Sequence, residues 1–210
     1  MSPPDERYLG LISSIILLIF SISFSIFPIR NFFLPIFYQK GVFLDTLEII
    51  RTRRSIRRFE NRPIPEEFIE KILEAARWAP SGMNNQPWRF AVIGDEAVRE
   101  ELSTLTRYGW VVKSAKVLIA VFLDNAASYS RIKDIQAIGA CMQNMLLESH
   151  SLGLGAVWLG EIIKSCDHIR KILGLSLDLE LMAVLALGYP DEKPKIVKRK
   201  ALKDLIVFRK

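Results

Sequence analysis

The sequence predicts an α+β domain with a central sheet and helices on both of its faces. Short apolar runs alternate along the chain with stretches of helical periodicity. The runs that we interpret as strands are Trp88–Ile93, Val117–Leu123, Gly155–Leu159 and Leu179–Leu187. The second and the last are continuously apolar, which is typical of strands buried on both faces. Few, short strands separated by helices favour a sheet sandwiched between helices.

The first two predicted helices have clear boundary signals. Asp45 and Glu48 stand at N-cap and N3 spacing, which predicts a short helix over Asp45–Arg53. Pro65 suits the first turn of a second helix, which ends before Pro80.

Three further helices follow. Asp95–Arg107 is amphipathic and is expected to lie on the surface. Asp134–Leu152 is apolar around much of its circumference, so we expect it to be covered on most sides, in part by a second subunit. Ser165 and Gly174 stand at the N-cap and C′ positions of a last helix.

Residues 1–41 are predicted to be a hydrophobic extension that precedes a domain at 42–210. Leu9–Ile29 contains no charged residue and is long enough to span a bilayer as one helix. Positive charge is heavier after this segment than before it, which predicts that the domain faces the cytoplasm. An over-extended gene start is equally compatible, because no Met lies between Met1 and Met83. Without the extension, a cytoplasmic protein is expected.

Charge and cysteine content exclude some classes of site. The net charge of +6 is moderate, and the basic residues gather mainly in Arg51–Arg62 and Lys193–Lys210. Clusters of this kind favour local anion sites over a nucleic-acid-binding face. Cys141 and Cys166 have no zinc-ligand spacing, so no metal site is expected.

An arginine-rich segment, Arg51–Arg58, offers guanidinium groups and the Ser55 hydroxyl within a short stretch. Arginine binds phosphate or carboxylate oxygens through paired hydrogen bonds, so this segment indicates an anion site. A solvated basic face or a membrane-surface patch is the alternative.

A second constellation is the loop Ala79–Trp88, in which prolines and a glycine fix an irregular bend. Its four polar side chains are Ser81, Asn84, Asn85 and Gln86. They offer donors and acceptors for the edge of a polar ring, and a fixed loop loses little entropy on binding. The alternative is a plain connection from helix to strand.

The segment Gly153–Glu161 lacks the third glycine of a dinucleotide-binding fingerprint and runs from helix to strand, which is the wrong order. We instead expect Gly160 and Glu161 to end a strand beneath a flat ligand. A basic tail, Lys198–Lys200, is a further candidate for binding anions. His150 and His168 have no partner at recognisable spacing and are expected to be structural.

Taken together, these segments resemble the nitroreductase family of FMN-dependent oxidoreductases. The most specific parts are Arg53–Phe59, Ala79–Trp88, and the helix through Asn144 that leads into Gly153–Trp158. The resemblance covers about Phe43 to Val207. It implies a mostly antiparallel sheet and a homodimer with two FMN sites at the interface and exchanged C-terminal arms.

The resemblance also implies a set of cofactor contacts. Arg53, Arg54, Ser55 and Arg57 would hold the FMN phosphate and the pyrimidine edge. Ser81 and Asn84 would contact the flavin, the former often from the other subunit. The remaining contacts are Leu159, Gly160 and Glu161 beside the flavin N5, and Arg199 with Lys200 or Lys198 at the phosphate.

The implied activity is hydride transfer from NADH or NADPH through the flavin to a nitroaromatic, a quinone or a similar small electrophile, by ping-pong turnover. The chemistry belongs to the flavin, so no catalytic acid or base is expected. A dehalogenase or a flavin-fragmenting enzyme of the same fold is the alternative. A non-enzymatic basic module on a membrane or on nucleic acid is a third interpretation.

Two departures from the family pattern bear on this reading. No long insertion follows Val121–Asp124 to roof the substrate site, and Ala201 stands where a proline usually follows the last basic cluster. The identity of the acceptor therefore stays open.

Overall fold

The computed structural model describes residues 45–194 and 197–210 of the chain. The extension predicted at 1–41 lies outside these residues. Within the described ranges, no helix combines the length and the apolar character needed to cross a membrane.

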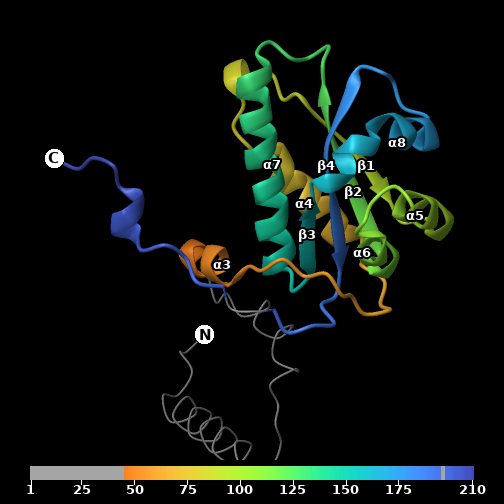
Figure 1. The fold of residues 1–210 in the computed structure, drawn as a ribbon, viewed down its shortest axis with the longest axis horizontal. Coiled ribbons are helices and arrows are strands. Elements are labelled where there is room, and N and C mark those ends of the chain that lie inside the picture. Colours follow the sequence, from red (N-terminus) through yellow and green to blue (C-terminus); the bar gives the residue numbers. More distant parts are fainter. Residues whose placement is uncertain (1–44, 195–196) are drawn as a thin grey trace, which may run out of the picture. The chain divides into compact units, whose positions relative to one another are not determined.

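A four-stranded sheet forms the centre of the domain (Figure 1). Its order is β1 (Trp88–Ile93), β2 (Val117–Asp124), β4 (Leu179–Gly188) and β3 (Gly155–Leu159). All three neighbouring pairs are antiparallel, which confirms the predicted sheet. The two continuously apolar strands, β2 and β4, occupy the centre of the sheet, because only a central strand is covered on both faces and both edges.

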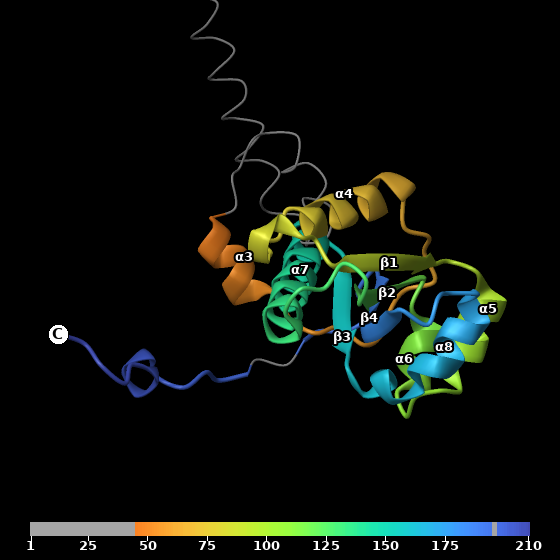
Figure 2. The same ribbon diagram turned by 90° about the horizontal axis from the view of Figure 1, so that it is seen from above.

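Helices cover both faces of the sheet, as predicted (Figure 2). One face packs against α4 (Glu66–Arg77) and α7 (Arg131–Ser151). The other packs against α5 (Glu96–Ser103), α6 (Gly109–Ser114) and α8 (Cys166–Leu173). Side chains of β2 alternate between the two cores, as the period of a strand requires.

The boundary signals of most helices are confirmed. α3 (Thr46–Thr52) begins after Asp45, whose carboxylate accepts the backbone N–H of Leu47 at 3.3 Å. Pro65 directly precedes α4. Gly174 ends α8 in the left-handed conformation, at φ 63°. Short 3-10 turns at Gly82–Asn84, Glu161–Ser165 and Leu202–Leu205 complete the described elements.

The helix predicted over Asp95–Arg107 is wrong in its extent. α5 ends at Ser103, and a turn leads into the separate helix α6, which the sequence analysis missed. The two helices meet so closely that a Cβ atom at Gly109 would lie 2.3 Å from the carbonyl oxygen of Ser103. The glycine is therefore required by a tertiary contact, which local periodicity does not reveal.

The helix α7 is tied to the rest of the domain at both ends. Near its start, the fully buried Asp134 carboxylate accepts hydrogen bonds from Ser128, Tyr129, Ser130 and Asn85. Burial would raise the pKa of Asp134, but these hydrogen bonds outweigh it and lower the pKa. Near the end of α7, His150 Nε2 lies 2.8 Å from the Thr52 hydroxyl at the end of α3.

Replacing Asp134 with Ala should destabilise the domain by about 2–4 kcal/mol, because several buried donors lose their acceptor at once. Equilibrium unfolding by urea at neutral pH measures this change. Asp167→Ala, which removes a largely exposed carboxylate, is the control and should change stability by less than about 0.5 kcal/mol. Equal effects of the two substitutions would contradict the role given to Asp134.

Candidate cofactor site

Three guanidinium groups, those of Arg53, Arg54 and Arg199, form a cationic cluster that we call the arginine cradle. Arg53 is half-buried at the end of α3. Burial lowers its pKa, and the positive charges of Arg199 and Arg54 lower it further. Among the described residues, the groups that shift the pKa of Arg53 do not include a carboxylate. Such an arrangement costs free energy unless an anion binds there.

Arg54 also stabilises the backbone beneath the cradle. Its Nη1 donates to the carbonyl oxygens of Arg51, at 2.6 Å, and of Arg53, at 2.8 Å. These carbonyls belong to the last turn and the C-cap of α3, where helical partners are missing. Part of the Arg54 guanidinium is therefore engaged by the protein itself.

The segment after the cradle lies against the edge of the sheet. Ser55 pairs with Ala156 of β3 in a parallel bridge, and the Ile56 N–H donates to the Ala156 carbonyl at 3.1 Å. A Cβ atom at Gly155 would lie 2.7 Å from the side chain of Ile56. Gly155 is thus needed for this close approach and not only to begin a strand.

Arg57 lies beyond this contact, with an exposed side chain. Its backbone N–H donates to the Glu192 carboxylate at 2.5 Å. The segment of the arginines and the chain after β4 are thereby held together. Lys200 is exposed, and no contact to the cradle ties it to the site.

The end of β3 presents the three residues predicted to lie beside the ligand. Leu159 is buried, Gly160 is exposed, and Glu161 points back into the protein. The Glu161 carboxylate accepts from the Thr106 hydroxyl at 2.7 Å and from the Arg107 N–H at 3.3 Å, and it pairs with Lys164. The contact with Lys164, followed by that with Thr106, lowers the pKa of Glu161 to about 2.

The turn at residues 106–108 was not among the predicted site residues. Thr106 also accepts the Tyr108 N–H at 3.2 Å, so Glu161 fixes the whole turn beside the end of β3. The Arg107 guanidinium lies 5.2 Å from the centre of the Tyr108 ring. No spacing or motif marks these residues, because their proximity to Glu161 arises only in the fold.

The loop Ala79–Trp88 is rigid and strained, as expected for a binding loop. Met83, Asn84 and Gln86 have φ values of 54°, 55° and 47°, a region that costs non-glycine residues about 1–3 kcal/mol each. Ser81 Oγ accepts the Gln86 N–H at 3.0 Å, and Asn85 Nδ2 donates to Asp134 at 2.8 Å. These contacts hold the strained backbone in place.

The loop presents Met83 and Asn84 to solvent, with Met83 87% exposed. Gly82 lies directly beneath the Tyr129 ring, since a Cβ atom there would overlap the Tyr129 hydroxyl at 1.8 Å. Contacts with Tyr129 thus hold the loop on its inner side, while Met83 and Asn84 are exposed on its outer side. This arrangement suits a surface that contacts a ligand or a second chain.

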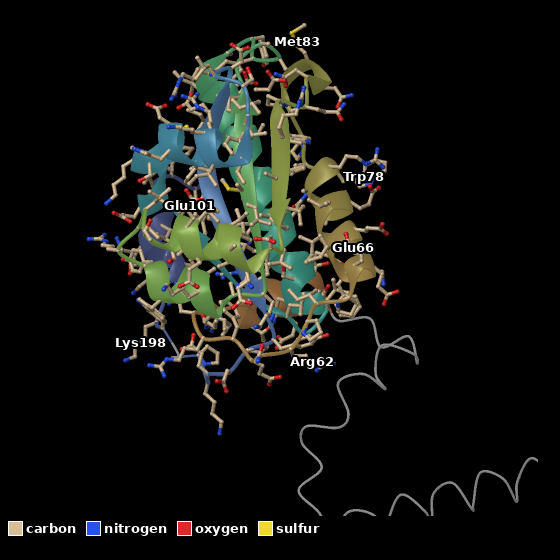
Figure 3. The ribbon with its side chains drawn as sticks, turned by 90° about the vertical axis from the view of Figure 1, so that its right-hand side faces the viewer. Arg62, Glu66, Trp78, Met83, Glu101 and Lys198 are labelled. Carbon is tan, nitrogen blue, oxygen red and sulfur yellow. The ribbon has the colours of Figure 1, made fainter. Side chains whose placement is uncertain are left out.

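Within one chain, the structure does not bring this loop to the cradle. The loop is tied to Asp134 in the first turn of α7, whereas the cradle adjoins His150 in the last turn. Sixteen residues of continuous helix separate the two, which is about 24 Å. Figure 3 shows the same separation, with Met83 at one end of the domain and Arg62 and Lys198 at the other.

The chain matches the family model described as "Nitroreductase family" over residues 50–116 and 106–189. This chain belongs to the nitroreductase family. The match spans both the arginine segment and the strands that flank the predicted site, so the family assignment rests on the same residues as the geometry above.

Individual relatives support the assignment. This nitroreductase-family chain is 39% identical over 153 residues to a Methanothermobacter thermautotrophicus protein assigned as NADH dehydrogenase/NAD(P)H nitroreductase, covering 72% of this chain and 80% of that protein. A Desulfovibrio desulfuricans nitroreductase structure in complex with FMN superposes with a TM-score of 0.76. It is 46% identical and covers 80% of this chain and 98% of its own. Iodotyrosine deiodinase of Thermotoga neapolitana is 29% identical over 174 residues, covering 70% and 90% respectively.

The low pKa of Glu161 predicts that the 106–108 turn stays fixed throughout the neutral range. A carboxylate with a lowered pKa contributes its full stabilisation above its unfolded value, about 4.3, and loses it only as the pH falls toward about 2. Glu161→Gln should therefore speed amide hydrogen exchange in residues 105–109 at pH 7. Glu101→Gln on exposed α5 is the control, and unchanged exchange in the Glu161 variant would contradict this role.

Proposed function

We propose that this chain binds FMN at the arginine cradle and along β3, and transfers hydride from NADH or NADPH to a small electrophilic acceptor, such as a nitroaromatic or a quinone. The observation that carries this proposal is the convergence of Arg53, Arg54 and Arg199 without an acid. Together with the family membership, it supports an NAD(P)H-dependent FMN oxidoreductase whose domain is 42–210.

The cradle suits the phosphate of FMN in charge and in shape. A phosphate monoester carries a charge between −1.5 and −2 at neutral pH. Two or three guanidinium groups can neutralise this charge through paired hydrogen bonds. The Ser55 hydroxyl lies in the same segment, beside Ala156 at the start of β3.

The end of β3 suits the flat ring. Ala156 and Gly160 are four residues apart along extended backbone, which is about 13 Å. An elongated cofactor with its phosphate at the cradle would therefore place its ring near Leu159 and Gly160. The absence of a side chain at Gly160 leaves its backbone open to a flat ligand.

FMN supplies the redox chemistry when bound, accepting and donating hydride at N5. The chain's own residues would position the cofactor and stabilise the turn beside it. Arg53 and Arg199 hold the phosphate, and Glu161 fixes the turn that carries the cation of Arg107 beside the end of β3. The proposal requires no proton transfer by a side chain. The nicotinamide and the acceptor are proposed to bind in turn at the same open face of the flavin ring.

The second half of the site is proposed to come from a second copy of the chain. The loop that carries Ser81 and Asn84 is tied to Asp134, which lies about 24 Å along α7 from His150 beside the cradle. A twofold axis that crosses α7 near its middle would reverse the helix of the partner. The partner's loop would then lie near the cradle, and each dimer would contain two equivalent sites.

The surface of α7 supports such a dimer. One stripe of the helix is uncharged and consists of the exposed Ile132, Gln136 and Gln143 and the half-buried Gly139 and Leu147. The exposed charges of α7, Arg131 and Lys133, lie in its first turn. Gly139 stands near the middle, where a Cβ atom would meet no described residue within 4 Å outside its own stretch of helix. A small residue with free space is what a close crossing of two helices requires.

The tail after Arg199 is proposed to embrace the partner. Its apolar residues are exposed in the single chain: Leu202, Leu205, Ile206, Val207 and Phe208. In both ribbon views this segment points away from the body of the domain (Figures 1 and 2). Apolar residues gathered in this way usually mark a contact with another chain.

Arg53→Ala should weaken FMN binding by about 1–3 kcal/mol, the range for a hydrogen bond to a charged group. Quenching of flavin fluorescence during titration of the apoprotein measures the change. Lys171→Ala, which removes an exposed cation on α8, is the matched control. Wild-type affinity in the Arg53 variant would contradict the placement of the phosphate.

Complementation tests whether the site is shared. Arg53→Ala disables the cradle, and Asn84→Ala alters the loop. If each site uses one cradle and one loop from different chains, a mixed dimer of the two variants contains one intact site. NADPH-dependent nitroaromatic reduction should then recover toward half of the wild-type rate in the mixed dimers. Rates no higher than the mean of the two variants would contradict a shared site.

Gly139→Arg should separate folding from assembly. The single chain has room for the side chain, so the unfolding transition of the domain should persist. A charged, bulky residue at the helix crossing should prevent dimer formation and, with it, tight FMN binding. Analytical ultracentrifugation and flavin absorbance report the two effects. A variant that is dimeric and retains FMN would show that α7 does not form the interface.

Dehalogenation of an aromatic substrate is a second candidate activity, because the deiodinase relative belongs to the same set of similar proteins. The same cradle and strand end would serve both reactions, and the acceptor would decide between them. Supplying the reduced enzyme in turn with a nitroaromatic, a quinone and an iodinated phenol distinguishes the candidates. Faster flavin reoxidation by the iodinated phenol than by the others would favour the second.

A further inference from the structure

Two segments of the domain carry its net positive charge. Residues 45–62 hold six basic and three acidic side chains, and residues 190–210 hold eight and three. Residues 63–189 between them hold twelve basic and fifteen acidic side chains, so this larger part is net negative. The basic character of the domain therefore does not come from an evenly charged surface.

The fold brings these two segments together at one end of the domain. Phe59 and Pro190 form an antiparallel bridge, and backbone hydrogen bonds link Glu60 with Tyr189 and Asp191 with Arg58, at 2.9 and 3.0 Å. Gly188 permits this approach, because a Cβ atom there would lie 2.7 Å from Phe59. Figure 3 shows Arg62 and Lys198 at this same end, opposite Met83.

The proposed cofactor site does not account for all of this charge. Setting aside the cradle, Arg57 and Lys200, eight exposed cations remain among the described residues of the two segments. Four of them flank the bridge between Phe59 and Pro190 in the chain, and we call these four the basic end: Arg58, Arg62, Lys193 and Lys198. The Arg62 guanidinium lies 3.7 Å above the Tyr189 ring, which holds it at the surface. The nearby acids are Glu60, Asp191 and Glu192, and the last is engaged by the Arg57 N–H.

We propose that the basic end docks on the headgroups of an anionic lipid surface. The uncharged run Leu9–Ile29 precedes the domain by a short stretch, and the chain enters the domain at Asp45, beside the arginine segment. Clusters of Lys and Arg next to an apolar segment are attracted to anionic headgroups. This inference is independent of the acceptor and of how the cofactor site is shared.

A nucleic acid fits the basic end less well. Proteins that bind single strands combine positive charge with exposed aromatic rings on which bases stack. Around these four cations, Phe59 is 7% exposed and the Tyr189 ring is covered by Arg62. The exposed Phe208 belongs to the apolar tail that is proposed to contact the partner. The basic end thus offers charge without a stacking surface, which suits a layer of headgroups.

Fluorescence on vesicles tests the proposal with the full chain. A Cys166→Ser background leaves Cys141, whose burial raises its pKa to about 12 and keeps it unreactive. One environment-sensitive label is placed through Asn61→Cys at the basic end or, as control, through Leu177→Cys, an exposed position just before β4 and at the opposite end of that strand from Gly188. The vesicles consist of phosphatidylcholine with or without phosphatidylglycerol.

The label at residue 61 should brighten on vesicles that contain phosphatidylglycerol, and high salt should reverse most of the change. The label at residue 177 should respond much less. Arg58→Gln and Arg62→Gln should each weaken the apparent binding by about fivefold, whereas Lys133→Gln, at the start of α7, should not.

Equal responses on the two kinds of vesicle, or equal responses at residues 61 and 177, would overturn the proposal. So would a response at residue 61 to a single-stranded oligonucleotide without one to anionic vesicles, because that result would identify a nucleic-acid surface. Since flavin absorbance is recorded on the same samples, loss of FMN is distinguished from loss of lipid binding.

Discussion

The length of α7 is the constraint on which the organisation of the proposed site depends. Its first turn anchors the strained loop through Asp134, and its last turn adjoins the arginine cradle through His150. A continuous, buried helix of 21 residues cannot bend to bring these two ends together. If one cofactor is held by both, as proposed, it lies between two chains, and the uncharged stripe on the same helix fits that arrangement.

Close backbone contacts and side-chain hydrogen bonds position the other segments of the proposed site. Glycines at 155 and 188 let the arginine segment lie against β3 and β4. The Glu161 carboxylate accepts hydrogen bonds from Thr106 and from the Arg107 N–H. It therefore holds the 106–108 turn beside the end of β3 and has a structural role there. This division suits an enzyme that positions a cofactor and leaves the chemistry to it.

The sequence was sufficient to predict most elements, because apolar runs, Pro65 and Gly174 act locally. It failed between Asp95 and Ser114, where the end of α5 depends on the packing of Gly109 against Ser103. Two of the three arginines of the cradle, Arg53 and Arg54, could be grouped from the sequence because they are adjacent in the chain. Anion binding by the cradle stays a prediction. The 106–108 turn was not, because its contact with Glu161 joins residues about 55 positions apart. The cofactor roles of all the predicted site residues stay predictions.

Native mass spectrometry of the purified holoprotein tests the central claim most directly, since it counts chains and flavins in one particle. A site built from two chains predicts two FMN molecules on a dimer and none retained on the monomer that appears as the dimer is diluted. A monomer that carries one FMN with the affinity of the dimer would contradict the claim and would place the whole site within a single chain.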